Sequence, residues 1–195
     1  MNKNVIRIMT IAGFIALTQG CSLKPQYLHL DPAVNAATAN APAGSGTIAL
    51  SVEDSRSTTK LGEVGDPDRK MVDVSLEEDF RPVLYAKIAD ALTQRGFKVV
   101  PAGEDADRTL IVNVRRLELS SRKQPLTFDT ELRAEVSAES RHGEDSYDKL
   151  FYVRTHKETA GPPYLKDSNA LVNSAVSQSL EDLLSDEKLL EFLAR

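Results

Sequence analysis

The sequence has very little cysteine, histidine or tryptophan. Its 195 residues contain one cysteine, Cys21, and no tryptophan. A single cysteine cannot form an intramolecular disulfide, so the fold must be stable without covalent cross-links. The three histidines, His29, His142 and His156, have no metal-binding spacing. We therefore expect no metal site and no cofactor.

Short catalytic motifs are absent as well. The sequence contains no Gly-x-Ser-x-Gly, His-Glu-x-x-His or Cys-x-x-Cys. The glycines at 44–46 are not followed by the Gly-Lys-Ser/Thr of a phosphate-binding loop. We therefore expect a protein that is not an enzyme.

Long apolar runs are scarce, and the clearest one lies close to the first residue. Ile8 to Leu17 is an apolar run interrupted only by Thr10 and Gly13, and it follows the basic Lys3 and Arg7. A membrane-spanning helix needs about 20 apolar residues, so this run is too short to span and suits a cleaved export signal. We predict a lipoprotein signal peptide over residues 1–20.

Cys21 stands directly after this signal. The small Gly20 precedes it, as in bacterial lipoproteins, although Leu17 lies four residues before the cysteine instead of three. We predict that Cys21 is acylated and holds the protein permanently in the membrane, because two or more acyl chains give stable attachment. In enterobacterial lipoproteins an aspartate after the cysteine tends to retain the protein in the inner membrane, so the likeness implies that Ser22 favours the outer membrane. The alternatives are the outer leaflet of the inner membrane, or a plain secretory signal and a free periplasmic domain.

Charge and composition describe an acidic globular protein. Without Lys3 and Arg7, 22 basic side chains face 29 acidic ones. A surface of this charge repels phosphate backbones, so we expect no nucleic-acid partner. The apolar fraction of 41% is enough for a sizeable core.

The polar region after Cys21 separates the anchor from the domain. Residues 21–46 are rich in Ala, Asn, Pro and Gly and show no helical or strand period, so we predict a lipid anchor and flexible tether. The alternative is an arm that packs on the domain through Tyr27, Leu28 and Leu30. A single globular domain is expected over residues 47–195.

Hydrophobic periodicity predicts an α+β fold for this domain. Alternation predicts strands over 47–52, 97–100, 107–119, 128–139 and 147–159. Residues 53–68 are expected to form a long loop or loose hairpin, with a short strand at 71–74. The predicted sheet is mixed and largely antiparallel, with two main amphipathic helices packed on one face and a short C-terminal helix.

The helix boundaries are predicted from capping residues. Ser75 and Glu78 match a capping box, which places the first helix over 76–95 with Gly96 at its end. Asp167 or Ser168 is expected to cap the second helix. Apolar residues at helical spacing continue to Leu193, and we interpret them as core rather than as a partner site.

Several segments together resemble one protein family. Residues 75–80, 93–97, 110–114 and 169–176 follow, in order and spacing, the pattern of the YajG family of bacterial lipoproteins. The resemblance implies a periplasm-facing lipoprotein of uncharacterised activity. Asp54 and Arg56, which follow the first predicted strand, also look like family features. We expect them to form a loop-fixing ion pair, with ligand contact as the alternative.

Two functions remain open at this point. The first is a non-catalytic binding or assembly module of the cell envelope, which contacts a partner protein through the sheet edge, the 53–70 loop or the terminal helix. The second is a ligand carrier or an enzyme that acts on a cell-wall or lipid component. For the second, Asp54 and Arg56 are the best candidates.

The anchor prediction is tested by Cys21→Ser. Without the thiol no acyl chain can be attached, so palmitate labelling should disappear and the protein should move from the membrane to the soluble fraction. Radiolabelled palmitate and membrane fractionation measure both effects. Ser22→Ala is the control and should keep the label. Unchanged fractionation of Cys21→Ser would rule out the anchor.

Overall fold

The computed structural model of the chain describes residues 24–34 and 45–195. In this part of the chain one eight-stranded sheet and three helices form, which confirms the predicted α+β class. The strands are β1 (Gln26–Leu28), β2 (Thr47–Asp54), β3 (Lys60–Asp66), β4 (Lys70–Leu76), β5 (Lys98–Pro101), β6 (Arg108–Lys123), β7 (Phe128–His142) and β8 (Asp145–Thr159). The helices are α2 (Arg81–Gln94), α3 (Leu165–Leu184) and α4 (Glu187–Ala194).

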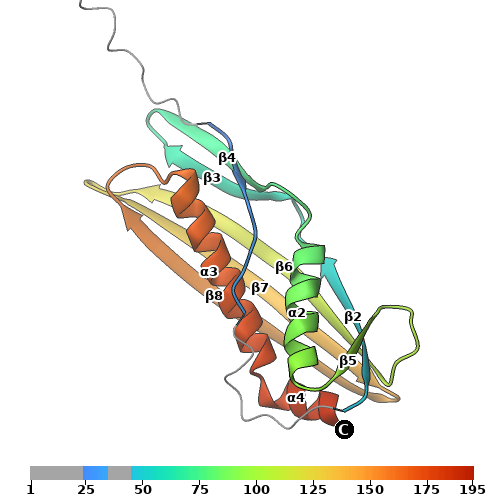
Figure 1. Cartoon of the computed structure of the whole chain (residues 1–195). Coiled ribbons are helices and arrows are strands. Elements are labelled where there is room, and N and C mark those ends of the chain that lie inside the picture. Colours follow the sequence, from blue (N-terminus) through green and yellow to red (C-terminus); the bar gives the residue numbers. More distant parts are fainter. Residues whose placement is uncertain (1–23, 35–44) are drawn as a thin grey trace, which may run out of the picture.

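Strand β6 lies at the centre of the sheet (Figure 1). One edge of β6 pairs with antiparallel β7, and β7 pairs with antiparallel β8. The other edge has two successive parallel neighbours, β2 along 108–114 and β3 at 119–120. Beyond them lie β5 on one side, and β4 and then β1 on the other. Four of the seven pairings are parallel, so the sheet is more mixed than the sequence predicted.

A bulge in the middle of β6 changes which residues face the core. The register against β7 shifts between Val114 and Arg116, which makes Arg115 an extra residue. Val114 and Leu117 are both buried, whereas the two arginines between them are exposed. The extra residue shifts the alternation of side chains along β6 by one position. Leu117 and Leu119 therefore face the same core as Val114.

The predicted 53–68 loop is mostly a β-hairpin. β3 and β4 pair antiparallel from Lys60 to Ser75, and only short connections remain outside the strands. Gly62 allows β3 to approach β6, because a Cβ atom at this position would lie 1.8 Å from the carbonyl oxygen of Leu119. Its φ of +156° is also unfavourable for other residues. The sequence therefore places glycine where β3 meets β6.

The predicted start of the first helix is wrong. Ser75 and Leu76 belong to β4, where they pair with Tyr27 and Leu28 of β1, so the expected capping box does not form. α2 begins at Arg81, with Pro82 in its first turn, where the fixed proline φ favours a helix start. The predicted end is close: α2 closes at Gln94, and Gly96 follows with a φ of +96°.

The predicted cap of the second helix is also displaced. Tyr164 is the N-cap of α3, and Asp167 lies in the first turn. The Asp167 carboxylate accepts a hydrogen bond from the Tyr164 backbone N–H at 3.3 Å. Asp167 therefore stabilises the helix start from inside the helix.

The flexible-tether prediction is wrong for residues 24–34. β1 pairs with β4, and Leu28 and Leu30 are buried, as the alternative of a packed arm required. Tyr27 differs from that alternative because its side chain is 62% exposed. Gln26 Nε2 donates to the Pro163 carbonyl at 2.9 Å, which ties the arm to the start of α3. Cys21 and residues 35–44 lie outside the described residues.

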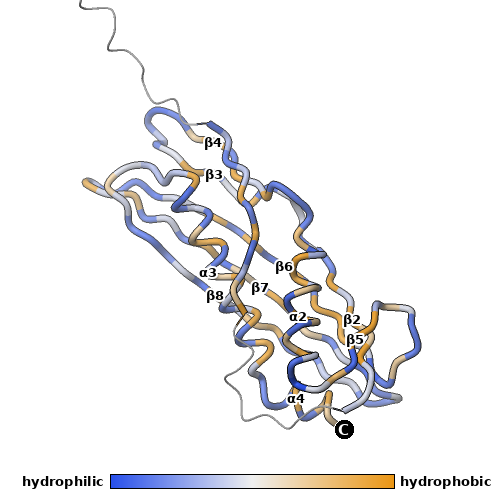
Figure 2. Tube along the Cα trace, in the orientation of Figure 1, coloured by the Kyte–Doolittle hydropathy of each residue, from blue (hydrophilic) through white to orange (hydrophobic). Residues whose placement is uncertain are grey.

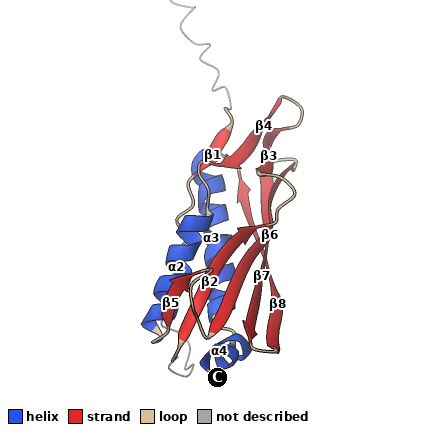
Figure 3. Ribbon diagram, turned by 90° about the vertical axis from the view of Figure 1, so that its right-hand side faces the viewer, coloured by secondary structure: helices blue, strands red, loops and turns tan. Residues whose placement is uncertain are grey.

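Helices α2 and α3 lie on the same side of the sheet (Figure 3). The buried residues of both helices and the inward-facing residues of the strands form one hydrophobic core. Along the long strands, hydrophilic and hydrophobic residues alternate (Figure 2), which matches one buried and one solvent-exposed face. In α4, Leu189, Leu190, Phe192 and Leu193 are all buried, as a core role predicts.

Candidate functional site

The first candidate site is the Asp54 and Arg56 pair just after β2. Arg56 donates to Asp54 twice, from Nε to Oδ1 and from Nη2 to Oδ2, both at 2.8 Å. The Arg56 backbone N–H also donates to Asp54 Oδ1 at 3.1 Å. Hydrogen bonds from the Arg56 side chain lower the pKa of Asp54, which keeps the carboxylate charged. The structure thus brings these two predicted residues together.

Further contacts hold this loop against the rest of the domain. The Arg56 guanidinium lies 4.8 Å from the centre of the Phe80 ring, and only 7% of its side chain is exposed. The Ser55 backbone N–H donates to the Val114 carbonyl at 3.0 Å. These contacts fit a loop-fixing role for the ion pair.

A groove of about 800 Å³ opens beside this loop. It lies where β6 has no partner strand on one edge, between Val114, the last residue paired with β2, and Leu119, the first paired with β3. Arg56 lines this groove, and its Nη1 atom is buried without a hydrogen-bond partner in the described structure. We call this space the β6 groove.

The other cations that line the β6 groove are already paired. Arg115 Nη2 lies 3.3 Å from Glu139 Oε1, and Arg116 Nη1 lies 3.2 Å from Glu135 Oε1. Lys60 Nζ contacts both Glu63 and Asp73 at 2.7 Å. The groove is therefore polar and nearly balanced in charge. Its lining residues include Ser55, Arg56, Ser57, Thr58, Lys60, Arg115, Arg116, Ser120 and Ser121.

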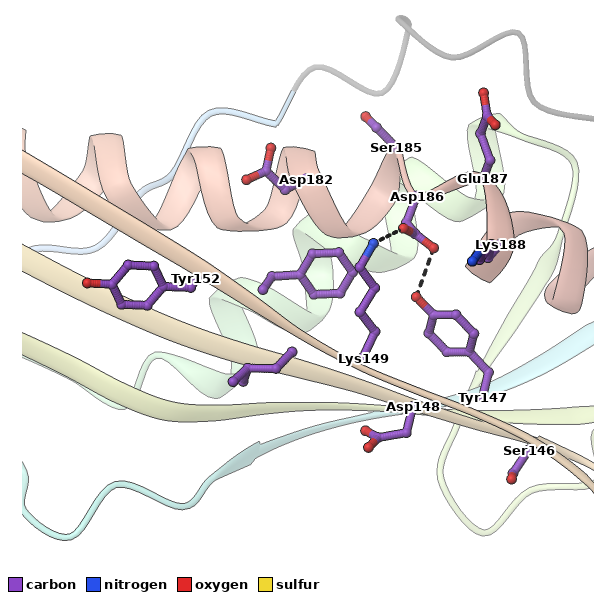
Figure 4. Close-up of a pocket in the computed structure, with 12 residues that line it drawn as sticks. Ser146, Tyr147, Asp148, Lys149, Tyr152, Asp182, Ser185, Asp186, Glu187 and Lys188 are labelled. Carbon is purple, nitrogen blue, oxygen red and sulfur yellow. Dashed lines mark hydrogen bonds and ion pairs between the residues drawn. The ribbon is translucent and has the colours of Figure 1, made fainter.

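A second groove, of about 970 Å³, lies between β8 and the helices α3 and α4 (Figure 4). Its walls are residues 146–152 of β8, Asp182 of α3 and residues 185–188. We call it the β8 groove. In Figure 4, Tyr147 and Lys149 both point toward Asp186.

Asp186 joins β8 to the start of α4. Its Oδ1 atom accepts hydrogen bonds from Tyr147 Oη at 2.8 Å and from the Leu189 backbone N–H at 2.9 Å. Its Oδ2 atom accepts from Lys149 Nζ. The bond from the Leu189 backbone N–H caps α4, since a side-chain oxygen of the N-cap residue satisfies a free N–H of the first turn.

The environment shifts the pKa of both acidic groups in this cluster. Burial acts to raise the pKa of Asp186, but hydrogen bonds from Lys149, Leu189 and Tyr147 outweigh it and lower the pKa. Burial and the Asp186 carboxylate raise the pKa of Tyr147. Tyr147 therefore stays a proton donor and Asp186 an acceptor at neutral pH. Sequence reasoning missed this cluster, although an aspartate just before a helix is a typical N-cap signal.

The outer edge of β8 is not covered by any strand in the described part of the chain. β8 is 15 residues long and pairs with β7 alone. On the face turned away from the helices, Leu150 is 50% exposed and Tyr152 is 53% exposed. Unpaired backbone groups and apolar side chains therefore lie together at this edge.

Residues 24–34 and 45–195 contain no group of three or more His, Cys, Asp and Glu side chains placed to hold a metal ion. Within the same ranges, none of the helices has the length and apolar character needed to cross a membrane.

Comparison with solved structures defines the fold. The chain is similar to protein XCC0632 from Xanthomonas campestris, with a TM-score of 0.56 and 14% identity over 88% of this chain and 97% of that one. It is also similar to a neuraminyllactose-binding hemagglutinin homolog from Helicobacter pylori, with a TM-score of 0.45 and 9% identity over 87% and 92% of the two chains. The first likeness shows a shared α+β fold.

Comparison with protein families gives the identity of the chain. Residues 32–194 match the model of a family described as uncharacterized lipoprotein. The chain therefore belongs to this lipoprotein family, which is the YajG-type family that its sequence resembles. Among curated proteins, none matches the sequence.

The structural role of Asp186 predicts how stability depends on pH. Because the folded-state pKa of Asp186 lies below its ordinary value of 3.8, its contribution is complete above that value and is lost as the pH falls through the folded pKa. Asp186→Asn should therefore lower the free energy of unfolding at pH 7 by about 1–3 kcal/mol. The difference from the wild type should shrink toward pH 3.

Urea unfolding at both pH values measures this difference. The control is Asp182→Asn, which changes an exposed aspartate of the same groove and should have little effect at either pH. An Asp186→Asn effect that is the same at pH 7 and pH 3 would contradict a role for the charged carboxylate.

Proposed function

We propose that this lipoprotein is a non-catalytic binding or assembly module of the cell envelope. In this proposal acylated Cys21 anchors it in the outer membrane, and the domain faces the periplasm. The family membership supports an envelope lipoprotein. The export signal, Gly20 before Cys21 and Ser22 after it support the site of attachment.

The uncovered edge of β8 is the observation that carries this proposal. An exposed strand edge can bind another chain by extending the sheet, and flanking side chains then give specificity. β8 offers such an edge, with half-exposed Leu150 and Tyr152 along it and the β8 groove beside it. We propose that the partner protein binds along this edge.

The position of the anchor is consistent with a partner at β8. β1 begins at Gln26, five residues after Cys21, and an extended chain spans at most about 3.6 Å per residue. An acylated Cys21 would then hold β1 within about 18 Å of the membrane. β1 and β8 lie at opposite ends of the strand order that runs through β4, β3, β6 and β7. The anchor therefore leaves the β8 edge open to a partner.

The chemistry of both grooves supports a non-catalytic role. Asp54 and Arg56 are occupied with each other, and Asp186 is occupied with a helix cap, Tyr147 and Lys149. These hydrogen bonds and ion pairs make the carboxylates of Asp54 and Asp186 less available for proton transfer.

Photocrosslinking in intact cells tests the binding edge. A photoreactive phenylalanine analogue in place of Tyr152 should give a protein adduct, because this side chain lies at the proposed contact. The control is the same substitution at Tyr164, which is 60% exposed at the start of α3. Adducts at 152 that are no stronger than those at 164 would count against the proposal.

The β6 groove supports a second candidate, a carrier of a small envelope ligand. Its volume is sufficient for a small molecule, and the buried Nη1 of Arg56 lacks a hydrogen-bond partner in the described structure. A buried donor of this kind is satisfied by a ligand acceptor or by water.

Native mass spectrometry of protein extracted from membranes tests this second candidate. The wild type should carry an added mass beyond its own lipid, and Ser120→Trp should remove it by filling the β6 groove. The control is Ser174→Trp, which changes an exposed serine of α3 outside both grooves. A wild type without added mass, or equal masses in both variants, would contradict a carrier function.

A further inference from the structure

On the face of β8 turned away from the helices, two opposite charges lie symmetrically about Phe151. Asp148 is three residues before it and Arg154 is three residues after it, while Glu158 lies near the end of the strand. Leu150 and Tyr152 lie between the two charges, with their side chains half-exposed. An antiparallel copy of the same strand would therefore place acidic residues opposite basic ones.

We propose that the β8 edge binds a second copy of this chain, with the two β8 strands antiparallel across a two-fold axis. The inference rests on the proposed function, since it takes the β8 edge as the binding surface and names its partner. A two-fold axis makes every contact occur twice, because the same surface is used on both copies. The two sheets would join into one continuous sheet.

One register satisfies both the charges and the apolar side chains. With Phe151 opposite Phe151 of the second copy, Asp148 lies opposite Arg154, and Leu150 lies opposite Tyr152. Directly opposite side chains on one face are about 4.5–5.5 Å apart at Cβ, close enough for ion pairs and apolar contact. All four residues lie on the face turned away from the helices, where they are exposed.

Neighbouring registers lose this match. A shift that places Tyr152 opposite itself sets Leu150 against Arg154, and a shift that places Leu150 opposite itself sets Asp148 against Tyr152. Shifts by one residue set side chains of opposite faces against each other, because side chains alternate along a strand. The charge and apolar pattern of β8 therefore selects a single alignment.

The residues of this interface are available for it. Asp148 forms no ion pair with any other described residue, and its side chain is exposed. Arg154 already contacts Glu131, but its side chain remains 57% exposed. A guanidinium has five N–H donors, so it can bind Glu131 and an aspartate of the second copy together. Among the described strands β8 pairs with β7 alone, so its other edge is free for a second copy.

Disulfide capture between two full-length copies tests the register. Leu150→Cys and Tyr152→Cys are placed in copies with different affinity tags, and both copies are expressed in the same cells. A disulfide bond needs a Cβ separation of about 3.5–4.5 Å. Opposite cysteines, at about 4.5–5.5 Å, reach it with a small local adjustment. The control combines Leu150→Cys with His156→Cys, whose residues lie four positions out of alignment. Cys21 is common to both pairs and does not affect the comparison.

We expect at least about tenfold more disulfide-linked dimer for the 150 and 152 pair than for the control pair, because opposite residues alone are within reach. Equal yields, or no dimer from either pair, would overturn the proposal.

Charge reversal tests the ion pairs independently. Asp148→Arg alone and Arg154→Asp alone set like charges opposite each other, so co-purification of the two tagged copies should fall at least about tenfold. When one copy carries Asp148→Arg and the other Arg154→Asp, opposite charges face each other again. Co-purification should then return to within about twofold of the wild type. Glu158→Arg reverses an exposed charge outside the alignment and serves as the control.

The two proposals can fail separately. Adducts at position 152 that contain another protein and no second copy would overturn self-association and leave a binding edge in place. Single charge reversals that co-purify as well as the wild type would also overturn self-association. The combination of Asp148→Arg in one copy with Arg154→Asp in the other distinguishes a charge effect from misfolding, because two misfolded variants would not recover binding when combined.

Discussion

The hydrogen bonding of β6 is the constraint on which the rest of the structure depends. One edge of this 16-residue strand is covered continuously by β7, while the other is shared by two shorter strands, β2 and then β3. Between these two neighbours the edge is uncovered, and there the β6 groove opens. The bulge at Arg115 lies at the same place. The Asp54 and Arg56 pair lies here because β2 ends where this uncovered stretch begins, and its contacts with Phe80 and Val114 attach the loop after β2 to the core.

The strands and helices with strong periodicity could be predicted from the sequence, and the elements defined by distant contacts could not. β7 alternates strictly from Phe128 to Val136, so its existence and its buried face were predictable. β1 has only three residues, and it is a strand because β4 pairs with it and Leu28 enters the core. The same pairing draws Ser75 into β4, which is why a plausible capping box at this serine failed. Local patterns carry no information on such partners.

The candidate sites show the same division. The ion pair of Asp54 and Arg56 was predictable because the two residues are close in sequence and follow a strand. The cluster at Asp186 was not, because Tyr147 and Lys149 are almost 40 residues away and reach it only after β8 packs on α3 and α4. Its N-cap signal was present in the sequence, but a cap residue does not reveal what else binds to it. The β6 groove depends on strand order, which hydrophobic periodicity does not specify.

The uncovered edge of β8 could pair with unrelated strands, and the charged residues of its sequence can limit such pairing. A long uncovered strand invites indiscriminate pairing, and proteins limit this with charged side chains along such edges. β8 carries Lys149, Arg154 and Lys157, yet it also exposes Leu150 and Tyr152 at its centre. Charges of one sign along the edge would repel a copy of β8. With Asp148 before this apolar centre and Arg154 after it, the edge is self-complementary in one antiparallel alignment. The order of charges, rather than their number, therefore sets the specificity of this edge.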